Sequence, residues 1–374
     1  MDSCSVLIVG AGPAGTSCAR RLHQAGIDTI LLDKSTFPRD KLCGGWITPA
    51  VIQELEIDLG DYARGRVLQT INGFRTSRMG DASIETDYGR AISYGIRRFE
   101  FDDYLLQRCG ARLIGGTPLK TIERASDGWI VNAEIRARLI VGAGGHFCPV
   151  ARFVGADARK EVAVAAQEVE FEMDARQRDA CAVRGEIPEL YFCADMKGYG
   201  WCFRKGDYLN IGLGRLDRQS LPAHVGEFVK YLKKIGKIGF DLPISMMGHA
   251  YLIYRETKRP IAGDGVLLIG DAAGLAYSQS GEGIRPAIES GLLGAKAIIA
   301  ADGNYTRERL EKYRDFLTER FGESQGDWST RMGRKIPRSW MHWFARMLLG
   351  TRWFSRRVVL DKWFLHADVP AMNG

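Results

Sequence analysis

The chain opens with the pattern that most constrains its fold, SVLIVGAGPAGTSCARRL. The apolar run 5–9 predicts a short buried strand. Gly10, Gly12 and Gly15 follow it in the spacing GxGxxG, and residues 13–22 carry a helical pattern that begins with a proline. A strand, a glycine turn and a helix in this order predict the first part of a doubly wound, dinucleotide-binding fold.

Each glycine of this turn has a physical reason. Gly10 allows the tight turn, Gly12 lets a pyrophosphate approach the backbone, and Gly15 lets the helix pack closely on the strand. A second predicted strand, Asp28–Leu32, ends at Asp33. Because a carboxylate at this place can accept from both ribose hydroxyls, the segment predicts the binding of a dinucleotide such as FAD or NAD.

A glycine-rich segment late in the chain favours FAD over NAD. The predicted strand Val266–Ile269 runs into Asp271, which can bond the ribityl hydroxyls of a flavin. A long helix is predicted from Gly283 and Ile284, and unpaired N–H groups at its start would point at the flavin pyrimidine edge, which becomes anionic on reduction. No second GxGxxG with its own strand and helix is present, so no separate NAD(P)H domain is predicted.

Short alternating strands separate the nucleotide-binding segments. VAVAAQEVEFEM, ELYFCA, GWCF, YLNIGLG, VLQTINGFRTS and ASIETDY all have this character. We predict one antiparallel substrate-binding sheet from residues 61–90 and 161–258, inserted into an FAD-binding domain of residues 1–60, 91–160 and 259–303, with a helical segment at 304–374. The expected fold class is α/β: a Rossmann-like FAD-binding domain, an inserted antiparallel-sheet substrate domain and a helical C-terminal segment.

Three aromatic residues alternate along one predicted strand, GYGWCFRKG. Tyr199, Trp201 and Phe203 share one face of this strand, because successive side chains of a strand point to opposite faces. Periodicity alone favours an ordinary aromatic core stripe for the three.

Five motifs occur in order along the chain: GAGPAG with Asp33, RDKLCGG, Arg98 followed by FD and Leu105, LIVGAGG, and GDAAG with SGEGI. On these motifs the sequence resembles the FAD-dependent oxidoreductases of the aromatic-hydroxylase fold. It is most similar to their geranylgeranyl reductase branch, whose members reduce isoprenoid double bonds. The resemblance covers about residues 1–325.

The resemblance implies a place along FAD for a series of residues. Ala14, Asp33 and Lys34 would lie near the adenosine half, with Ile122 flanking the adenine; Gly44, Gly45 and Arg98 would lie along the cofactor; Asp271 would bond the ribityl chain; Gly283 and Ile284 would meet the flavin ring. Together with Gly10, Gly12 and Gly15 they make up the predicted cofactor site.

The resemblance also implies that the aromatic stripe lines the substrate cavity, with Arg204 where relatives have a proline. An isolated alkene is not polarised, so its reduction needs a proton at one carbon and a hydride from reduced flavin at the other. Tyr199, Trp201 and Phe203 would stabilise the cationic carbon by about 0.5–2 kcal/mol each. Cys43 is predicted to line the reaction pocket and to relay the proton, with Tyr199 as the next candidate. The competing interpretation of Cys43 is a small buried packing residue.

The net charge of +7 is confined to the end of the chain. Residues 331–374 hold nine Lys and Arg residues and two acids, which accounts for the whole excess. A nucleic-acid-binding protein would spread its basic face over the fold, so no nucleic-acid partner is expected. In SWMHWFARMLL, residues 339–349, the aromatic and apolar side chains share one helical face, which is typical of peripheral contact with a membrane. A helix docked on the FAD domain or on a dimer partner is the alternative.

The eight cysteines show no CxxC pair and no metal-ligand spacing, so no metal site is predicted. No signal-peptide pattern is present, and no apolar run approaches the roughly 20 residues that span a bilayer. We expect a cytoplasmic protein, peripheral on the inner membrane face where it contacts lipid.

The leading functional interpretation is an FAD-dependent reductase that hydrogenates isoprenoid (geranylgeranyl or polyprenyl) carbon–carbon double bonds, with NAD(P)H or reduced ferredoxin as the electron donor. A monooxygenase or hydroxylase that acts on a hydrophobic substrate is the alternative on the same fold. A lipid-binding flavoprotein without catalysis is the alternative of another class. The sequence leaves the polyprenyl substrate, the number of bonds reduced and the oligomeric state open.

Overall fold

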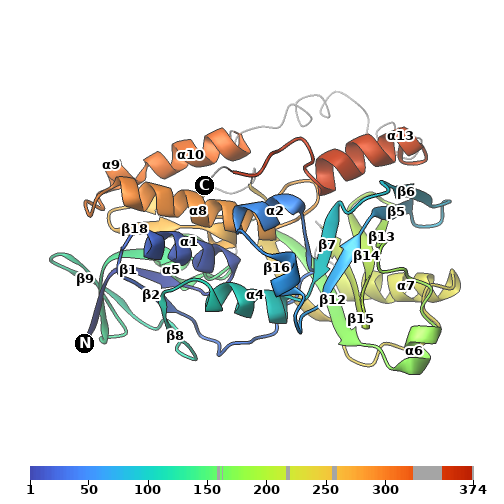
Figure 1. The fold of residues 1–374 in the computed structure, drawn as a ribbon, viewed down its shortest axis with the longest axis horizontal. Helices are drawn as coiled ribbons and strands as arrows, with labels where there is room; N and C mark the ends of the chain where they lie inside the picture. The colour runs from blue at the N-terminus through green and yellow to red at the C-terminus, as the bar shows by residue number, and fades with distance from the viewer. Residues whose placement is uncertain (158–160, 162, 216–219, 255–258, 323–347, 373–374) are drawn as a thin grey trace. The chain divides into compact units, whose positions relative to one another are not determined.

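The computed structural model describes residues 1–157, 161, 163–215, 220–254, 259–322 and 348–372 (Figure 1). The chain forms two compact units and passes between them several times. The first unit comprises Met1–Asp40, Phe99–Val162 and Tyr251–Gly326, and the second comprises Lys41–Arg98, Ala163–Ala250 and Asp327–Gly374.

These unit boundaries differ from the predicted domain boundaries. Residues 41–60 and 91–98, which were expected with the FAD-binding part, group with the second unit. The C-terminal segment from residue 304 is not a unit of its own, because it divides between the two. The assignment of FAD-binding and substrate-binding roles to parts of the chain stays a prediction.

The first unit is built on an eight-stranded sheet of order β17-β18-β11-β1-β2-β8, in which β10 pairs with β11 and β9. Strand β1 is parallel to β2 and β11, and β11 is parallel to β18. A strand in the middle of such a sheet is covered on both faces, which explains why all four residues of β2 are buried. The strands are β1 (Asp2–Val9), β2 (Thr29–Leu32), β8 (Arg112–Ile114), β9 (Ile122–Ala125), β10 (Gly128–Val131), β11 (Ile135–Gly142), β17 (Ala262–Gly263) and β18 (Val266–Leu268).

Two helices of the first unit, α1 (Pro13–Gln24) and α8 (Ile284–Ala300), pack closely on one another. Small residues meet where they approach, and a Cβ atom at Gly291 would lie 2.3 Å from the carbonyl oxygen of Ala14. Both helices were expected from the sequence at these places. The other helical elements are α4 (Arg98–Gln107), α5 (Pro149–Phe153), η2 (Gly270–Ala272), α9 (Arg307–Leu310) and α10 (Lys312–Phe321).

The second unit is built on a seven-stranded sheet of order β16-β12-β15-β14-β13-β5-β6. Two features correct the prediction of one antiparallel sheet. Strands β13 and β5 pair in parallel, and β4 joins β3 and β7 in a separate three-stranded sheet. The parallel pair is possible because no hairpin connects β5 to β13, which lie far apart in the chain.

The pairs β12–β15, β15–β14, β14–β13 and β5–β6 of the seven-stranded sheet are antiparallel, as predicted. Its strands are β5 (Gly73–Arg78), β6 (Ile84–Asp87), β12 (Ala163–Glu172), β13 (Glu189–Phe192), β14 (Gly198–Lys205), β15 (Tyr208–Arg215) and β16 (Met247–Leu252), and the smaller sheet has β3 (Trp46–Ile47), β4 (Leu68–Ile71) and β7 (Ser93–Ile96). The helices of this unit are α2 (Pro49–Glu54), α3 (Leu59–Tyr62), α6 (Ala175–Asp179), α7 (Leu221–Lys234), α13 (Arg352–Phe354) and the π-helix η3 (Ser355–Phe364). The α/β fold class is confirmed.

The two faces of the seven-stranded sheet differ in what they bury. Helix α7 covers one face over an apolar core that includes Phe228, and we call it the α7 face. The opposite face carries Tyr199, Trp201 and Phe203, and we call it the aromatic face. Tyr199 and Trp201 lie with ring centroids 5.9 Å apart, as the alternation predicted.

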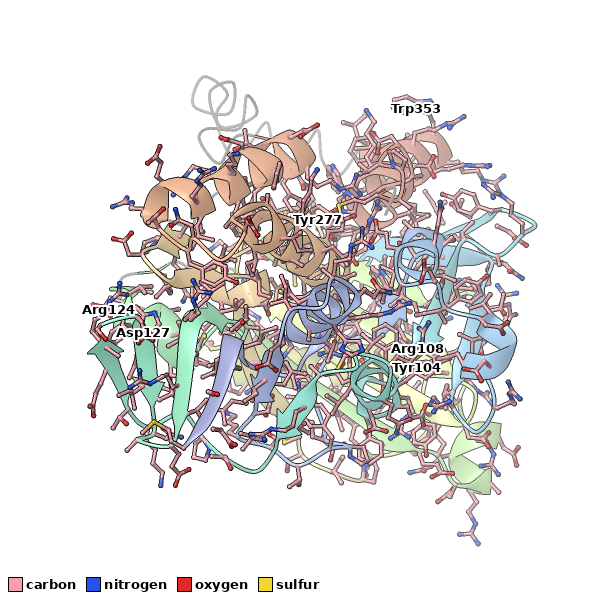
Figure 2. The ribbon with its side chains drawn as sticks, turned by 60° about the vertical axis from the view of Figure 1, so that its left-hand side comes forward. Tyr104, Arg108, Arg124, Asp127, Tyr277 and Trp353 are labelled. Atoms are coloured by element: carbon pink, nitrogen blue, oxygen red, sulfur yellow. The ribbon has the colours of Figure 1, made fainter. Side chains whose placement is uncertain are left out.

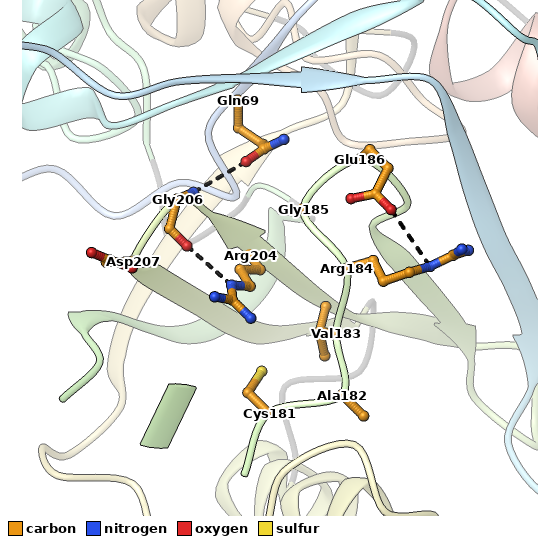
Figure 3. Close-up of a pocket in the computed structure, with 10 residues that line it drawn as sticks. All are labelled: Gln69, Cys181, Ala182, Val183, Arg184, Gly185, Glu186, Arg204, Gly206 and Asp207. Carbon is orange, nitrogen blue, oxygen red and sulfur yellow. Dashed lines mark hydrogen bonds and ion pairs between the residues drawn. The ribbon is translucent and has the colours of Figure 1, made fainter. Parts of the chain in front are cut away.

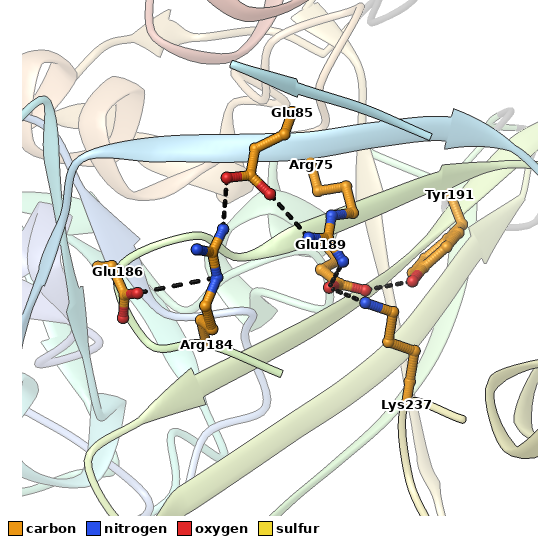
Figure 4. A network of polar contacts seen from close by, with 7 residues as sticks. All are labelled: Arg75, Glu85, Arg184, Glu186, Glu189, Tyr191 and Lys237. Carbon is orange, nitrogen blue, oxygen red and sulfur yellow. Dashed lines mark hydrogen bonds and ion pairs between the residues drawn. The ribbon is translucent and has the colours of Figure 1, made fainter. Parts of the chain in front are cut away.

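A buried carboxylate on the α7 face is fully paired (Figure 4). Glu189 accepts hydrogen bonds from Nη1 of Arg75 at 3.2 Å, from Nζ of Lys237 at 2.6 Å and from the hydroxyl of Tyr191. Arg75 also contacts Glu85 at 2.7 Å. The network satisfies a charge that burial alone would make unfavourable.

The end of the described chain packs onto the aromatic face. The ring centroid of Phe364 in η3 lies 5.3 Å from that of Tyr199 and 5.6 Å from that of Trp46. The hydroxyl of Tyr88, which follows β6, donates to Oδ1 of Asp361 in η3 at 2.6 Å and so holds η3 near the end of β6.

The helix predicted at residues 339–349 lies almost entirely outside the described residues, as does much of the basic segment 331–374. Among the helices that the structure describes, none combines the length and the apolar character needed to cross a membrane.

Candidate functional site

The glycine turn of the first unit has the close approaches that its sequence predicted. Gly10 has φ +114°, and a Cβ atom there would lie 2.4 Å from the carbonyl oxygen of Ala143. A Cβ atom at Gly15 would lie 1.9 Å from the carbonyl oxygen of Gly10. A larger residue at Gly15 would therefore push α1 away from the end of β1, and one at Gly10 would push the turn away from Ala143.

The start of α1 suits an anion. No side chain caps this helix, and a Cβ atom at Gly12 would meet no atom closer than Nη2 of Arg39, at 3.4 Å. Arg39 is held by Asp102, which is fully buried, at 3.1 Å. A helix N-terminus with a guanidinium group beside it provides the donors and the positive potential that a pyrophosphate needs.

Asp33 lies at the end of β2, where the pattern placed it. Its carboxylate accepts from the backbone N–H of Ala11 at 2.7 Å and from that of Ser35 at 2.8 Å. These two bonds orient the side chain and leave lone pairs for ribose hydroxyls. The neighbouring Lys34 is exposed, and Ile122 lies half-buried at the start of β9.

The late glycine-rich segment meets the first one within the same unit. A Cβ atom at Gly270 would lie 2.9 Å from Cβ of Ala14, and one at Gly283 would lie 3.3 Å from Oδ1 of Asp271. Helix α8 begins at Ile284. The backbone N–H of its second residue, Arg285, bonds to the Glu282 side chain, and Pro286 has no N–H, so Ile284 offers the N–H at the start of this helix to a ligand. The two ends of the predicted cofactor site therefore fit FAD: the uncapped start of α1 lies near Asp33, and Asp271 lies beside Gly283 at the start of α8.

Glu282 is a residue of this segment that the sequence reasoning did not select. Its Oε1 accepts from the backbone N–H of Arg285 at 3.1 Å, and burial raises the pKa of this carboxyl to about 7. A charged residue between two loop glycines, Gly281 and Gly283, was the sequence signal that could have identified Glu282.

The Cys-Gly-Gly loop lies on the aromatic face of the second unit. Gly45 has φ +67°, and a Cβ atom there would lie 2.3 Å from the carbonyl oxygen of Ile96. A Cβ atom at Gly44 would lie 3.4 Å from Cε2 of Phe203 and 3.6 Å from Nε1 of Trp201. The structure thus brings together two motifs that lie far apart in the chain, and the glycines make the approach possible.

Asn210 of β15 holds this arrangement and was not predicted. Its Oδ1 accepts from Nε1 of Trp201 at 2.6 Å, and its Nδ2 donates to the carbonyl oxygen of Cys43 at 3.1 Å. The side chain is almost fully buried. A single polar residue within the apolar alternation of YLNIGLG was the signal that could have identified it.

The Cys43 thiol is kept neutral. Burial raises its pKa above the ordinary value, although the nearby Arg98 and Lys205 act in the opposite direction. Cys43 is a free thiol, as are the other seven cysteines. A thiol of raised pKa is a poor nucleophile, so the site is unsuited to thiolate chemistry. Arg98, the first residue of α4, is buried in this unit.

Two carboxyl groups of β12 lie on the aromatic face in different environments. Oε2 of Glu170 contacts Nζ of Lys205 at 2.6 Å, and its Oε1 contacts Nε of Arg97 at 3.3 Å. Glu168 is fully buried, and burial raises the pKa of its carboxyl to about 8. One acid is thus paired with cations while its neighbour is desolvated, and two acids in unlike environments are typical of acid–base sites.

A cluster of aromatic rings lies beside the Cys-Gly-Gly loop. Besides the predicted stripe it contains Trp46, whose ring centroid lies 5.2 Å from that of Phe203, and Phe364 from the chain end. Neither was expected, because each comes from a segment remote from β14. Together these rings form a packed apolar cluster, in which Trp46, Trp201, Phe203 and Phe364 are buried.

The second unit also has a pocket near the turn of the β14–β15 hairpin (Figure 3). It is lined by Gln69, Cys181, Ala182, Val183, Arg184, Gly185, Glu186, Arg204, Gly206 and Asp207. None of these was predicted to bind cofactor or substrate. Nε of Arg204 donates to the carbonyl oxygen of Gly206 at 3.0 Å, so Arg204 stabilises its own hairpin turn.

Comparison with known proteins agrees with this geometry. A model of the FAD binding domain family matches residues 3–52. Menaquinone reductase of Mycobacterium tuberculosis (strain H37Rv) is 30% identical over 335 residues, which cover 80% of this chain and 78% of that protein. Digeranylgeranylglycerophospholipid reductase 2 of Methanosphaera stadtmanae is 27% identical over 347 residues, which cover 86% of this chain and 85% of that protein.

A solved structure is also similar, that of a geranylgeranyl bacteriochlorophyll reductase-like protein from Thermoplasma acidophilum. The TM-score is 0.73 at 23% identity, with 93% of this chain and 88% of that protein covered. The fold, the nucleotide-binding turn and these matches define an enzyme class, the FAD-dependent oxidoreductases. The chain belongs to the geranylgeranyl reductase family within that class. The predictions of FAD as cofactor and of this family are confirmed.

Proposed function

We propose that this protein hydrogenates carbon–carbon double bonds of an isoprenoid chain. The observation that carries the proposal is the position of Asn210, which bonds both to Trp201 of the aromatic stripe and to Cys43 of the Cys-Gly-Gly loop. An apolar aromatic surface and a neutral thiol loop are thereby held beside each other. The names of the relatives, reductases of a menaquinone and of a digeranylgeranyl lipid, support a substrate with an isoprenoid chain.

The proposed mechanism divides the reaction between cofactor and protein. FAD, when bound and reduced, supplies the hydride. Tyr199, Trp201 and Phe203 bind the isoprenoid chain and stabilise positive charge at the carbon that receives the hydride, by about 0.5–2 kcal/mol for each ring. Cys43 lines the reaction pocket and relays a proton, with Tyr199 as the next candidate. The apolar wall excludes water, which strengthens these electrostatic effects.

The proposed cofactor residues fall in both units. Gly10, Gly12, Ala14, Gly15, Asp33, Lys34, Ile122, Asp271, Gly283 and Ile284 belong to the first unit, and Gly44, Gly45 and Arg98 to the second. The electron donor in this proposal is NAD(P)H or reduced ferredoxin.

Peripheral membrane contact through residues 331–374 is part of the proposal. Within the described part, Trp353 is 68% exposed, and the adjacent Arg352, Arg356 and Arg357 are exposed (Figure 2). Tryptophan beside arginine is the combination that interfacial segments use against anionic lipid. Trp353→Ala should weaken co-sedimentation with vesicles of anionic phospholipid. Phe153→Ala, which removes an exposed aromatic ring of the first unit, should not. Equal binding of both variants and the wild type would contradict membrane contact.

The experiment that tests the activity is anaerobic. The FAD-loaded protein is reduced with dithionite and mixed with geranylgeranyl diphosphate and with polyprenyl lipids, and both flavin absorbance and product mass are followed. We expect reoxidation of the flavin together with a gain of hydrogen pairs in one substrate. If the flavin reoxidises only when oxygen is admitted and a substrate gains an oxygen atom, the monooxygenase alternative is favoured; if no substrate changes under either condition, the lipid-binding flavoprotein is favoured.

A further inference from the structure

Glu168 lies in a row of residues across the centre of the aromatic face. Trp201 of β14 is paired with Gly212 of β15, and Gly212 is paired with Glu168 of β12. Residues directly opposite each other in antiparallel strands point to the same face. A Cβ atom at Gly212 would lie 2.2 Å from Cζ2 of Trp201 and 2.7 Å from Cβ of Glu168. Because Gly212 has no side chain, the side chain of Glu168 and the edge of the Trp201 indole both lie over its backbone.

The carboxyl group of Glu168 is fully buried. Neither of its oxygens has a hydrogen-bond partner among the residues that the structure describes. Its nearest basic atom in that part of the chain is Nδ1 of His249 on β16, at 3.8 Å. A carboxyl group in such a place is destabilising by several kcal/mol if charged, and an apolar residue of the same volume would fit without that penalty. Packing therefore does not explain the presence of Glu168.

The charged groups around Glu168 come from every element that packs against it. They are Lys205 on β14, Glu170 on β12, Lys41 and Cys43 in the Cys-Gly-Gly segment, Arg98 at the start of α4 and His249 on β16. Three of these are cations that favour a charged carboxylate, yet desolvation outweighs them and the pKa of Glu168 rises to about 8. At neutral pH the carboxyl group holds its proton.

Among the acids near the loop, Glu168 is matched best to a proton transfer at neutral pH. A general acid is most effective when its pKa lies near the working pH. Burial moves the pKa of the Cys43 thiol upward from a value that is already high, so this thiol releases a proton less readily. Burial lowers the pKa of His249 to about 3, so its imidazole is neutral at pH 7. Its side chain is 19% exposed, and a neutral ring that accepts a proton on one nitrogen as it donates from the other can connect solvent with Glu168.

We infer that Glu168 holds the proton that the reduction consumes, beside Trp201 and the Cys-Gly-Gly loop, and that His249 returns a proton to it after each turnover. The inference rests on the proposed function. In the balanced step, the two π electrons of the alkene form a C–H bond with the proton from Glu168, and the hydride from reduced flavin forms the second C–H bond. Glu168 is left as a carboxylate, and the flavin is left oxidised.

The test compares three variants with the wild type in the FAD-loaded protein. Glu168→Gln keeps the shape and removes the proton, Glu168→Asp keeps an acid, and Glu172→Gln changes an exposed carboxyl of the same strand. With geranylgeranyl diphosphate as the probe, we expect flavin reoxidation in single turnover to slow at least 100-fold in Glu168→Gln, to recover in part in Glu168→Asp and to stay unchanged in Glu172→Gln. The wild-type rate should fall as pH rises through about 8, because the carboxyl group then loses its proton.

A second readout does not depend on turnover. Infrared difference spectra at pH 7 should show the C=O stretch of the protonated Glu168 carboxyl as a band that is present in the wild type and in Glu172→Gln and lost in Glu168→Gln, while the contribution of Glu282, whose pKa burial raises to about 7, stays in all three. This band should disappear as pH rises through about 8. Its absence at pH 7, or wild-type turnover by Glu168→Gln, would overturn the inference and leave the proposed function intact. If the wild type hydrogenates no polyprenyl substrate, the proposed function fails and this inference fails with it.

Discussion

Each face of the seven-stranded sheet buries a glutamate, and the two carboxyl groups differ in their hydrogen-bond partners. On the α7 face, Glu189 is paired with Arg75, Lys237 and Tyr191. On the aromatic face, Glu168 is buried without a hydrogen bond from the described residues. A paired charge holds strands and helix in place, whereas an unpaired acid is kept neutral and retains a proton to give. The difference separates a face that stabilises the fold from a face arranged for chemistry.

The largest expected effect comes from removing the paired carboxylate. Glu189→Ala leaves Arg75 and Lys237 without their buried partner, and we expect a loss of about 3–5 kcal/mol in the free energy of unfolding. Urea unfolding followed by circular dichroism measures it. Glu85→Gln, which removes a partly exposed partner of Arg75, should cost less than about 1 kcal/mol. Similar losses in the two variants would contradict a structural role specific to Glu189.

On the aromatic face, replacing the buried glutamate should raise the free energy of unfolding instead of lowering it. Glu168 has a pKa of about 8 when folded and 4.5 as the ordinary value, so between these values only the folded protein holds the proton. Wild-type stability therefore falls as pH rises from 4.5 through 8. Glu168→Gln lacks this dependence and should be more stable at pH 7, by up to about 3 kcal/mol.

Unfolding measured at several pH values checks this prediction. The gain of Glu168→Gln over the wild type should vanish near pH 4.5, grow toward pH 8 and then level off. His249, whose pKa is lowered to about 3 from 6.5, makes the stability of both proteins rise with pH between these values, so the two proteins are compared at each pH rather than across pH. A loss of stability at pH 7 would show that the carboxyl group has partners in the folded protein.

Substitution of one glycine on each face should have a smaller effect on stability and tests directly whether only the aromatic face serves catalysis. A Cβ atom at Gly212 would overlap the ring of Trp201, and one at Gly200 would overlap the ring of Phe228 on the α7 face. Gly212→Ala and Gly200→Ala should each cost about 1–3 kcal/mol of stability through overpacking. Only Gly212→Ala should also abolish hydrogenation of the probe, because only it displaces a ring of the proposed substrate wall. Equal loss of activity in both variants would contradict the division of the faces.

The smallest expected effect is that of Asn210→Leu. The substitution keeps the volume and leaves the indole N–H of Trp201 without its acceptor, which should cost about 1–2 kcal/mol. The Cys-Gly-Gly loop also loses its bond at Cys43, so kcat should fall more than KM rises. Steady-state kinetics with tryptophan fluorescence measures both, and an unchanged kcat would show that the loop is positioned by other contacts.

Much of the cofactor-binding part could be predicted from the sequence because its signals are local. The strand, the GxGxxG turn and the helix follow within one short segment, and the structure shows β1, the turn and α1 at those places. The period of two that put Tyr199, Trp201 and Phe203 on one face also needed no tertiary information. The prediction of a single antiparallel sheet was wrong at β13 and β5, since alternation reveals a strand and not its neighbour.

The sequence by itself determined which segments bind a dinucleotide and which side chains share a strand face, because these properties depend on residues close in the chain. Tertiary structure alone decided that Asn210 meets Cys43, 167 positions away, that Phe364 covers Tyr199, and that Glu168 has no hydrogen-bond partner among the described residues. Whether a buried polar group is paired depends on which distant segments pack around it, and desolvation then sets its charge. The chemistry proposed for this protein therefore rests on packing that no local pattern encodes.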